Sequence, residues 1–221
     1  MVNLDAFYVS HALEPVTLPP QALVDDYLPP YRPEHFLDPD RGESWGNVVS
    51  QDMYYRHRRD IGAAMERVPE VAAAADREWY GRTGRTWGVT ERYRCEDAEL
   101  VIVTMGSMCG TARDAVDALR GSGLAAGLLK VRLFRPLPAA ELRDALAGVR
   151  DVLVLDRNFS PGAGGVLHQE LRAALYGLKH APGVHGYLAG VGGVNVPPQK
   201  IMEFARQARA ADAEPEPVWV R

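Results

Sequence analysis

The fold is decided by the stretch AELVIVTMGSMCGTARDAVDALR at residues 98–120, in which an apolar run leads through glycines into a helical pattern. The same succession recurs further along the chain. Apolar runs occur at residues 100–103, 128–133, 152–155 and 184–189, and helical patterns occur at residues 111–121, 139–147, 165–178 and 198–209. Alternation at this spacing predicts a mostly parallel sheet with helices on both faces. The third run, VLVL, is apolar throughout, as expected of a central strand.

Residues 1–50 differ from this domain because they are rich in proline. The prolines are Pro15, Pro19, Pro20, Pro29, Pro30, Pro33 and Pro39. Each proline fixes its own φ and biases the preceding residue away from helix, so the segment is predicted to be an extended arm. Residues 6–10, AFYVS, are instead predicted to form a short buried strand. No other strand is close in sequence, so this strand would need a sheet that is either missing upstream or supplied by a partner.

Between residues 51 and 80 apolar residues recur at three- and four-residue steps, which predicts a helix. Pro69 is expected to kink or split this helix, and Gly81 and Gly84 are expected to end it. Residues 82–97 are predicted to be an irregular connection. We therefore divide the chain into an arm left from an upstream domain (residues 1–50), a helical linker (51–97), an α/β domain (98–210) and a tail (211–221).

The composition narrows the possible classes of function. A chain of 221 residues can bury a sizeable core, and a net charge of −4 gives no general attraction for nucleic acid. The two cysteines, Cys95 and Cys109, are too few for a structural zinc site or a four-thiolate cluster. The start, MVNLD, lacks the features of an export signal, and no apolar run is long enough to span a bilayer. We expect a cytoplasmic protein with free thiols.

Glycine-rich loops follow three of the predicted strands, at the edge where open parallel sheets hold their ligands. The candidate binding residues are Gly106, Ser107, Gly110 and Thr111 after the first strand, and Asp156, Arg157, Asn158, Ser160 and Gly162 after the third. In one interpretation the glycines let backbone N–H groups bind a phosphate at a helix N-terminus. In the other, the first loop is a tight turn with Ser or Thr as caps. The longer loop after the third strand would contact a substrate, a partner or another domain.

The sequence shows no pattern that is typical of catalysis. Cys109 lies near a predicted helix N-terminus, which would lower its pKa, but no histidine is near it in sequence. The six histidines show no metal-ligand spacing. We expect His168 to form a surface pair with Arg172 and His185 to be packed within a strand. Since the chain also lacks the Gly-x-Ser-x-Gly and His-Glu-x-x-His motifs, we predict no catalytic residue and no metal site.

Several phrases along the chain become recognisable when they are taken together. AFYVSHALEP at residues 6–15 and VDDYLPPY at residues 24–31 are followed by the stretch at 98–120, KVRLFRPLP at 130–138, VLDRNFSPGAGG at 154–165 and GVGGVNV at 190–196. In this order they resemble the alpha subunits of 2-oxoacid:ferredoxin oxidoreductases of the pyruvate synthase type. The first two phrases are similar to the end of a pyrimidine-binding domain and its linker. The others are similar to a transketolase C-terminal-like domain.

The resemblance implies a complex that oxidatively decarboxylates a 2-oxoacid, transfers the acyl group to CoA and reduces ferredoxin or flavodoxin. It implies that thiamine diphosphate with Mg²⁺ and the iron–sulfur clusters are held by partner subunits. This chain has no Gly-Asp-Gly motif and no cluster cysteines, and it begins after most of the pyrimidine-binding domain. Three explanations are open: a subunit split into two chains, a shortened relative kept for assembly, or removal of the front from this sequence.

We therefore expect a structural and assembly subunit of such an oxidoreductase, which is not catalytic alone. Its partners would be the pyrimidine-domain, thiamine diphosphate-binding and iron–sulfur subunits, without nucleic acid or membrane. The alternative is a stand-alone α/β module that binds a nucleotide or CoA through its glycine loops. In either case, the 2-oxoacid and the electron acceptor would be selected by residues outside this chain.

Overall fold

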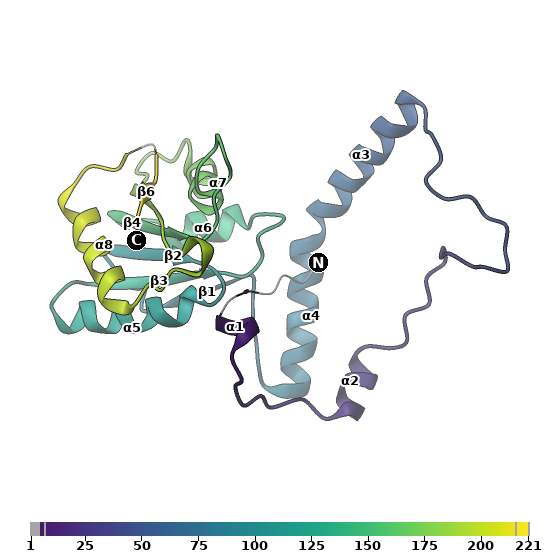
Figure 1. Ribbon diagram of the computed structural model, residues 1–221, viewed down its shortest axis with the longest axis horizontal. Helices are drawn as coiled ribbons and strands as arrows, with labels where there is room; N and C mark the ends of the chain where they lie inside the picture. The colour runs from purple at the N-terminus through teal and green to yellow at the C-terminus, as the bar shows by residue number, and fades with distance from the viewer. Residues whose placement is uncertain (1–4, 7, 215, 221) are drawn as a thin grey trace. The chain divides into compact units, whose positions relative to one another are not determined.

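The computed structural model describes residues 5–6, 8–214 and 216–220. The chain forms two compact units, one of Met1–Leu13 with Trp87–Arg221 and the other of Glu14–Thr86. The helices are α1 (Tyr8–His11), α2 (Gln21–Tyr27), α3 (Gln51–Glu66), α4 (Val68–Thr83), α5 (Met108–Gly121), α6 (Ala139–Ala145), α7 (Val166–Leu175) and α8 (Pro198–Ala210) (Figure 1). The strands are β1 (Thr90–Tyr93), β2 (Leu100–Thr104), β3 (Ala126–Val131), β4 (Asp151–Asp156), β5 (Gly183–Leu188) and β6 (Val218–Trp219).

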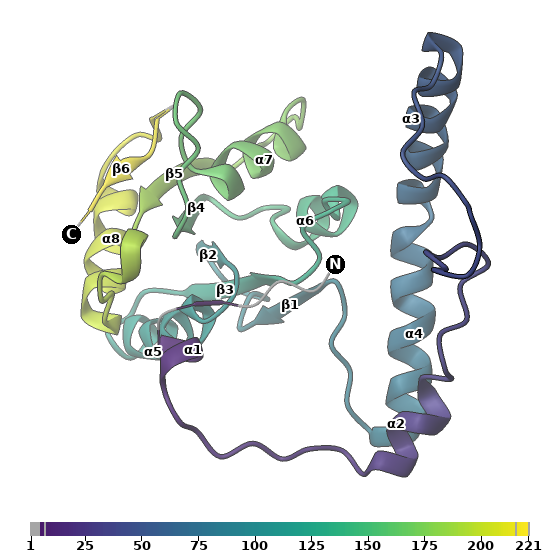
Figure 2. The same ribbon diagram turned by 45° about the vertical axis from the view of Figure 1, so that its right-hand side comes forward.

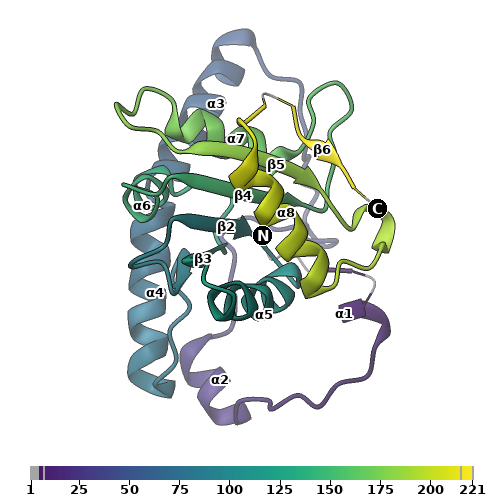
Figure 3. The same cartoon turned by 90° about the vertical axis from the view of Figure 1, so that its left-hand side faces the viewer.

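The first unit is built on a six-stranded sheet with the strand order β1-β3-β2-β4-β5-β6. Figure 3 shows the strands from β3 to β6 in this order. Neighbouring strands are parallel except for β1 and β3, which are antiparallel. In the centre of the sheet, Ile102 of β2 lies opposite Leu128 of β3 and Leu153 of β4. The predicted mostly parallel sheet is confirmed, and every residue of the central strand β4 is buried.

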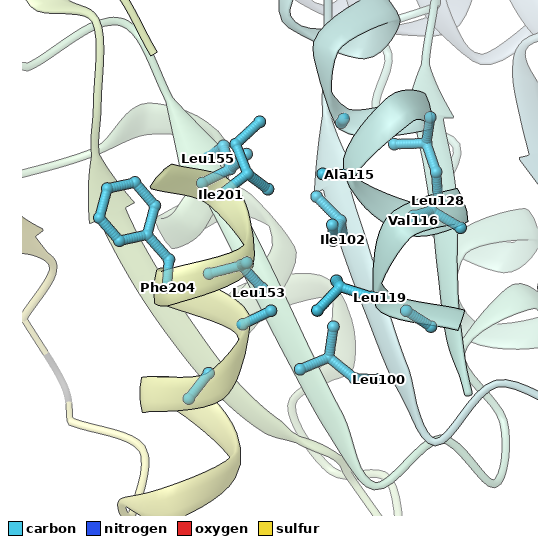
Figure 4. Close-up of a cluster of buried hydrophobic side chains, with 14 of the residues drawn as sticks. Leu100, Ile102, Ala115, Val116, Leu119, Leu128, Leu153, Leu155, Ile201 and Phe204 are labelled. Atoms are coloured by element: carbon cyan, nitrogen blue, oxygen red, sulfur yellow. The ribbon is translucent and has the colours of Figure 1, made fainter. Parts of the chain in front are cut away.

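Alternate side chains of the central strands point to opposite faces of the sheet. Leu100 and Ile102 of β2 pack in one core with residues of α5 and with Phe204 of α8 (Figure 4). Val101 and Val103 point to the other face, where α6 and α7 complete a second core. Full burial of one such side chain contributes roughly 1.5–3 kcal/mol, so these two layers hold the unit together. The prediction of helices on both faces is therefore confirmed.

Two edge strands were not predicted from the sequence. Strand β1 lies in the connection at residues 82–97 that we predicted to be irregular, and it pairs with β3 with Thr90 opposite Val131. Strand β6 lies in the tail, where Val218 pairs with Tyr187 of β5. Because an edge strand has one neighbour and these two are short, neither carries the apolar run by which the buried strands are recognised.

The second unit, Glu14–Thr86, contains α2, α3 and α4. Helices α3 and α4 follow one another as a long rod that is interrupted at Arg67 (Figure 2). Pro69 lies in the first turn of α4, so the predicted split is confirmed. Gly84 ends α4 with a φ of 68°, whereas Gly81 lies inside the helix and its predicted role was wrong. A glycine inside a helix costs about 1 kcal/mol relative to alanine.

Two predictions for the front of the chain need correction. The arm is not extended throughout, because α2 begins directly after Pro20, where a proline does not disturb helical hydrogen bonds. The strand expected at residues 6–10 is wrong for its described part, since Tyr8–His11 form a helical turn and Val9 is exposed. Phe7 lies outside the described residues. A helical turn satisfies backbone groups locally, whereas a lone strand leaves them without partners.

Candidate functional site

The candidate site lies where the connections of the sheet change direction. The chain leaves β2 through α5 on one face and leaves the adjacent β4 through α7 on the opposite face. In open α/β sheets, groups bind beyond the carboxyl ends of two strands at such a switch point. The loops that follow β2 and β4 contain the predicted candidates from Gly106 to Thr111 and from Asp156 to Gly162.

The carboxylate of Asp5 occupies this position. Its Oδ2 accepts a hydrogen bond from the backbone N–H of Ser107 at 2.6 Å. Gly106 makes this approach possible, because it adopts a φ of +66° and a Cβ at that position would lie 2.7 Å from the same oxygen. We call the group formed by Gly106, Ser107 and Arg157 the carboxylate cradle.

Arg157 supplies the positive charge of the cradle. Its Nη1 donates to Ser107 Oγ at 2.6 Å and lies 3.4 Å from Asp5 Oδ2. The loop after β5 also approaches it, since a Cβ on Gly190 would lie 3.1 Å from Arg157 Nε. Loops from three strands thus meet at one guanidinium. The side chains of Arg157 and Asp5 are 19% and 26% exposed, so water screens their attraction only in part.

Opposing effects act on the pKa of Asp5. Partial burial raises it, but hydrogen bonds from Ser107 and the N–H of Ala6, together with the charge of Arg157, bring the pKa below its ordinary value. Asp5 is therefore ionised at neutral pH. The cradle is an arrangement that holds a negative group.

Asp156 and Asn158 have a different role, because both bind the start of α7. The Asp156 carboxylate accepts from the N–H groups of Leu167 at 3.2 Å and His168 at 2.9 Å, and Asn158 Oδ1 accepts from Val166 at 3.3 Å. These bonds satisfy N–H groups that have no partner within a helix. Burial raises the pKa of Asp156 by more than its two N–H bonds lower it.

The other sequence candidates shape the local backbone. Gly110 and Thr111 lie within the first turns of α5. Ser160 bonds with Gly164 in a tight loop, where the Ser160 N–H donates to the Gly164 carbonyl at 2.8 Å, and Gly162 has a φ of +80°. The structure thus brings Gly106, Ser107 and Arg157 together at the cradle and places the remaining candidates in helix starts and turns.

Asp5 was missed by the sequence analysis. The residue lies next to the predicted strand at residues 6–10, in a segment that we did not connect with the glycine loops. It is separated from Arg157 by 152 positions, and no repeat or spacing pattern joins the two. An acidic residue near the start of a charged chain is common, so the sequence offered no specific signal for this contact.

The cysteine and histidine side chains do not build a second site in the described part of the chain. Burial raises the pKa of Cys109 to about 11, so the lowering expected from its helix position is wrong. His168 is buried against β5 rather than exposed, which corrects the predicted surface pair. His185 is packed as predicted, with Nε2 3.5 Å from Asp151 Oδ1. Among the described residues, no group of three or more His, Cys, Asp or Glu is placed to hold a metal.

Two family models match the chain. Core domain II of pyruvate:ferredoxin oxidoreductase matches residues 98–201, and the thiamine diphosphate-binding model of pyruvate flavodoxin/ferredoxin oxidoreductase matches residues 1–77. Pyruvate synthase subunit PorA of Methanothermobacter thermautotrophicus is 41% identical over 100% of this chain and 56% of its own length. PorA of Thermotoga maritima is 38% identical over 94% and 53%, respectively. Ketoisovalerate oxidoreductase subunit VorA of Pyrococcus horikoshii is 39% identical over 87% and 50%.

This chain belongs to the 2-oxoacid:ferredoxin oxidoreductase family. The resemblance stated from the sequence is therefore confirmed, and the chain spans about half the length of the curated relatives it matches. Asp5 lies in the part that matches one family model, whereas Ser107 and Arg157 lie in the part that matches the other. The cradle contact thus joins the two regions that the family models match.

Thiamine diphosphate, which the family model for residues 1–77 names, does not fit the described residues of that segment. Its rings need an enclosed pocket, yet no side chain from residue 9 to residue 77 is buried. Its diphosphate needs a metal with oxygen ligands, and no suitable acidic cluster is found in the part of the chain that the structure describes.

Proposed function

We propose that the chain is a structural and assembly subunit of a thiamine diphosphate-dependent 2-oxoacid:ferredoxin oxidoreductase. The observation that carries the proposal is the exposure of the second unit. All of Glu14–Thr86 is described, and no residue in it is buried. Its apolar side chains nevertheless include Met53, Tyr54, Tyr55, Ile61, Val71 and Tyr80, each of which is exposed. Large exposed apolar surfaces mark interaction sites, so this unit is suited to packing against other subunits.

Helix length supports the same proposal. Helices α3 and α4 have 16 residues each, which is little more than the length of about 12–15 residues below which isolated helices are marginal in water. Most helical stability in proteins comes from burial of one face. Because α3 has no buried residue, its stability would come from a covering surface supplied by a partner.

Under this proposal the reaction takes place on the assembled complex. A 2-oxoacid loses CO2, its acyl group passes to the CoA thiol, and the released electrons pass through iron–sulfur clusters to ferredoxin or flavodoxin. Partner subunits would hold thiamine diphosphate with Mg²⁺ and the clusters. We also propose a cytoplasmic location, because Cys95 and Cys109 are free thiols.

Co-purification of the native chain tests the proposal. We expect it to elute with subunits that carry thiamine diphosphate and iron–sulfur clusters. Tyr54→Ser combined with Ile61→Ser would remove apolar surface from α3 and weaken this association. Tyr176→Ser is the matched control, because it removes an exposed aromatic from the other unit. Elution of the native chain alone would contradict the proposal.

A second candidate function rests on the cradle itself. An N–H group at the start of α5 and a guanidinium are the donors that a phosphate or carboxylate uses. A stand-alone module that binds a nucleotide or CoA would be stabilised by these compounds. A ligand at a concentration a hundredfold above its Kd would raise the free energy of unfolding by about 2.7 kcal/mol. A thermal shift measurement with CoA, ATP or NAD(P) detects a change of this size. A flat response would exclude this function and leave the assembly proposal standing.

A further inference from the structure

We propose that Asp5 and the carboxylate cradle form an electrostatic latch that holds the segment at residues 5–13 on the α/β unit. Within its described part, the segment contains one helical turn, α1, of four residues, and the side chains from Val9 to Leu13 are exposed. These exposed side chains contribute little apolar burial, so the polar contact of Asp5 is an attachment that can be tested by itself.

The geometry of the contact favours a carboxylate. One oxygen of Asp5 accepts from the Ser107 N–H at 2.6 Å, and the other accepts from the Ala6 N–H at 2.9 Å. Arg157 Nη1 lies 3.5 Å from Oδ1 and 3.4 Å from Oδ2, so it faces both oxygens. An amide in place of the carboxylate would lose one acceptor and the charge that attracts Arg157.

The cradle is held in place without Asp5. The Arg157 guanidinium donates to Ser107 Oγ, and the glycine backbone at Gly190 lies against its Nε. Ser107 stands at the start of α5, whose inner face is packed in the core. Because the donors are already oriented, little side-chain entropy is lost when Asp5 binds, which makes the contact stronger than an ordinary surface ion pair.

The latch is a property of this chain alone. It joins the region that matches the thiamine diphosphate-binding family model to the region that matches core domain II. It does not depend on the proposed assembly function. The assembly function can fail while the latch is found, and the reverse is equally possible.

Hydrogen exchange on the full chain tests the latch. With Asp5→Asn or Arg157→Gln, we expect amides of residues 5–13 to exchange about three- to tenfold faster. The double variant should be no faster than either single variant, because both changes break the same contact. Exchange should also speed up in 1 M NaCl, where screening weakens the ion pair.

Controls with the same chemical changes are available in the other unit. Asp40→Asn and Arg41→Gln alter charges in an exposed turn and should leave exchange of residues 5–13 unchanged. If Arg157→Gln loosens the whole sheet, the Asp5→Asn variant alone tests the latch, because Asp5 lies outside the sheet. Unchanged exchange of residues 5–13 in Asp5→Asn, relative to Asp40→Asn, would overturn the latch.

Discussion

At the scale of single residues, two carboxylates of the α/β unit accept hydrogen bonds from backbone N–H groups. Asp156 binds two N–H groups of α7, and Asp5 binds one N–H of the Ser107 loop. Glycine stands beside both carboxylates, since a Cβ at Gly165 would lie 2.5 Å from Asp156 Oδ2 and one at Gly106 would lie 2.7 Å from Asp5 Oδ2. These glycines leave room for a carboxylate of the chain itself. A glycine motif in the sequence looks the same whether the glycines have this role or bind the phosphate of a ligand.

His168 makes the stability of this unit depend on pH. Burial, followed by the charge of Arg172, lowers its pKa, so the folded protein keeps the ring neutral. The unfolded chain takes up a proton below its ordinary pKa of 6.5. The neutral His168 ring therefore contributes fully to the free energy of unfolding above pH 6.5. This contribution is lost as the pH falls from 6.5 toward the lower pKa of the folded state, by up to about 1.4 kcal/mol per pH unit.

Replacement of His168 tests this dependence. His168→Leu keeps an apolar group of similar size against Gly186 and removes the titration. We expect its unfolding free energy in urea to change less between pH 7 and pH 5.5 than that of the unaltered chain. His180→Leu, at an exposed position, should keep the original dependence. If the unfolding free energy changed equally with pH in the two variants, the assignment of this dependence to His168 would be contradicted.

At the scale of elements, helix α7 depends on the carboxyl group at the end of β4. Asp156→Ala leaves the Leu167 and His168 N–H groups without their acceptor, and we expect it to destabilise the fold by about 1–3 kcal/mol. Asp156→Asn keeps an oxygen acceptor and avoids the burial of a charge, so it should cost less than Asp156→Ala. Urea unfolding measures both variants, with Asp114→Ala on the exposed side of α5 as control. An equal loss for asparagine and alanine would show that the charge, and not the oxygen acceptor alone, holds α7.

The sequence predicted the four buried strands and the long helices α3 and α4, and it missed the two edge strands. The runs that became β2, β3, β4 and β5 are apolar because both faces of these strands are covered, and the helix split at Pro69 follows from proline geometry. Strands β1 and β6 are defined by a single neighbour each. The cradle was found in part, because its loop residues stand next to glycines. Asp5 was not found, because tertiary folding alone brings it to Arg157.

At the scale of the whole molecule, the two units differ in how much of their surface is buried. The sheet unit has two apolar cores, whereas no residue of Glu14–Thr86 is buried. We expect amides of β4 in the isolated chain to exchange roughly a hundredfold more slowly than those of α3, because local opening of α3 exposes no core. Peptide-resolved hydrogen exchange measures this ratio. Similar rates in β4 and α3 would show that α3 is stable without a covering surface, against the proposed assembly function.

The exposure of α3 and α4 also has a consequence for the supply of this protein in the cell. Copies made in excess of their partners would present a long helical rod to proteases, since stability against cleavage follows the population of open states. Under the proposed function, such surplus copies would be degraded and assembled ones retained. We therefore expect the abundance of the chain to follow its scarcest partner, so that gene dosage of the other subunits sets its level.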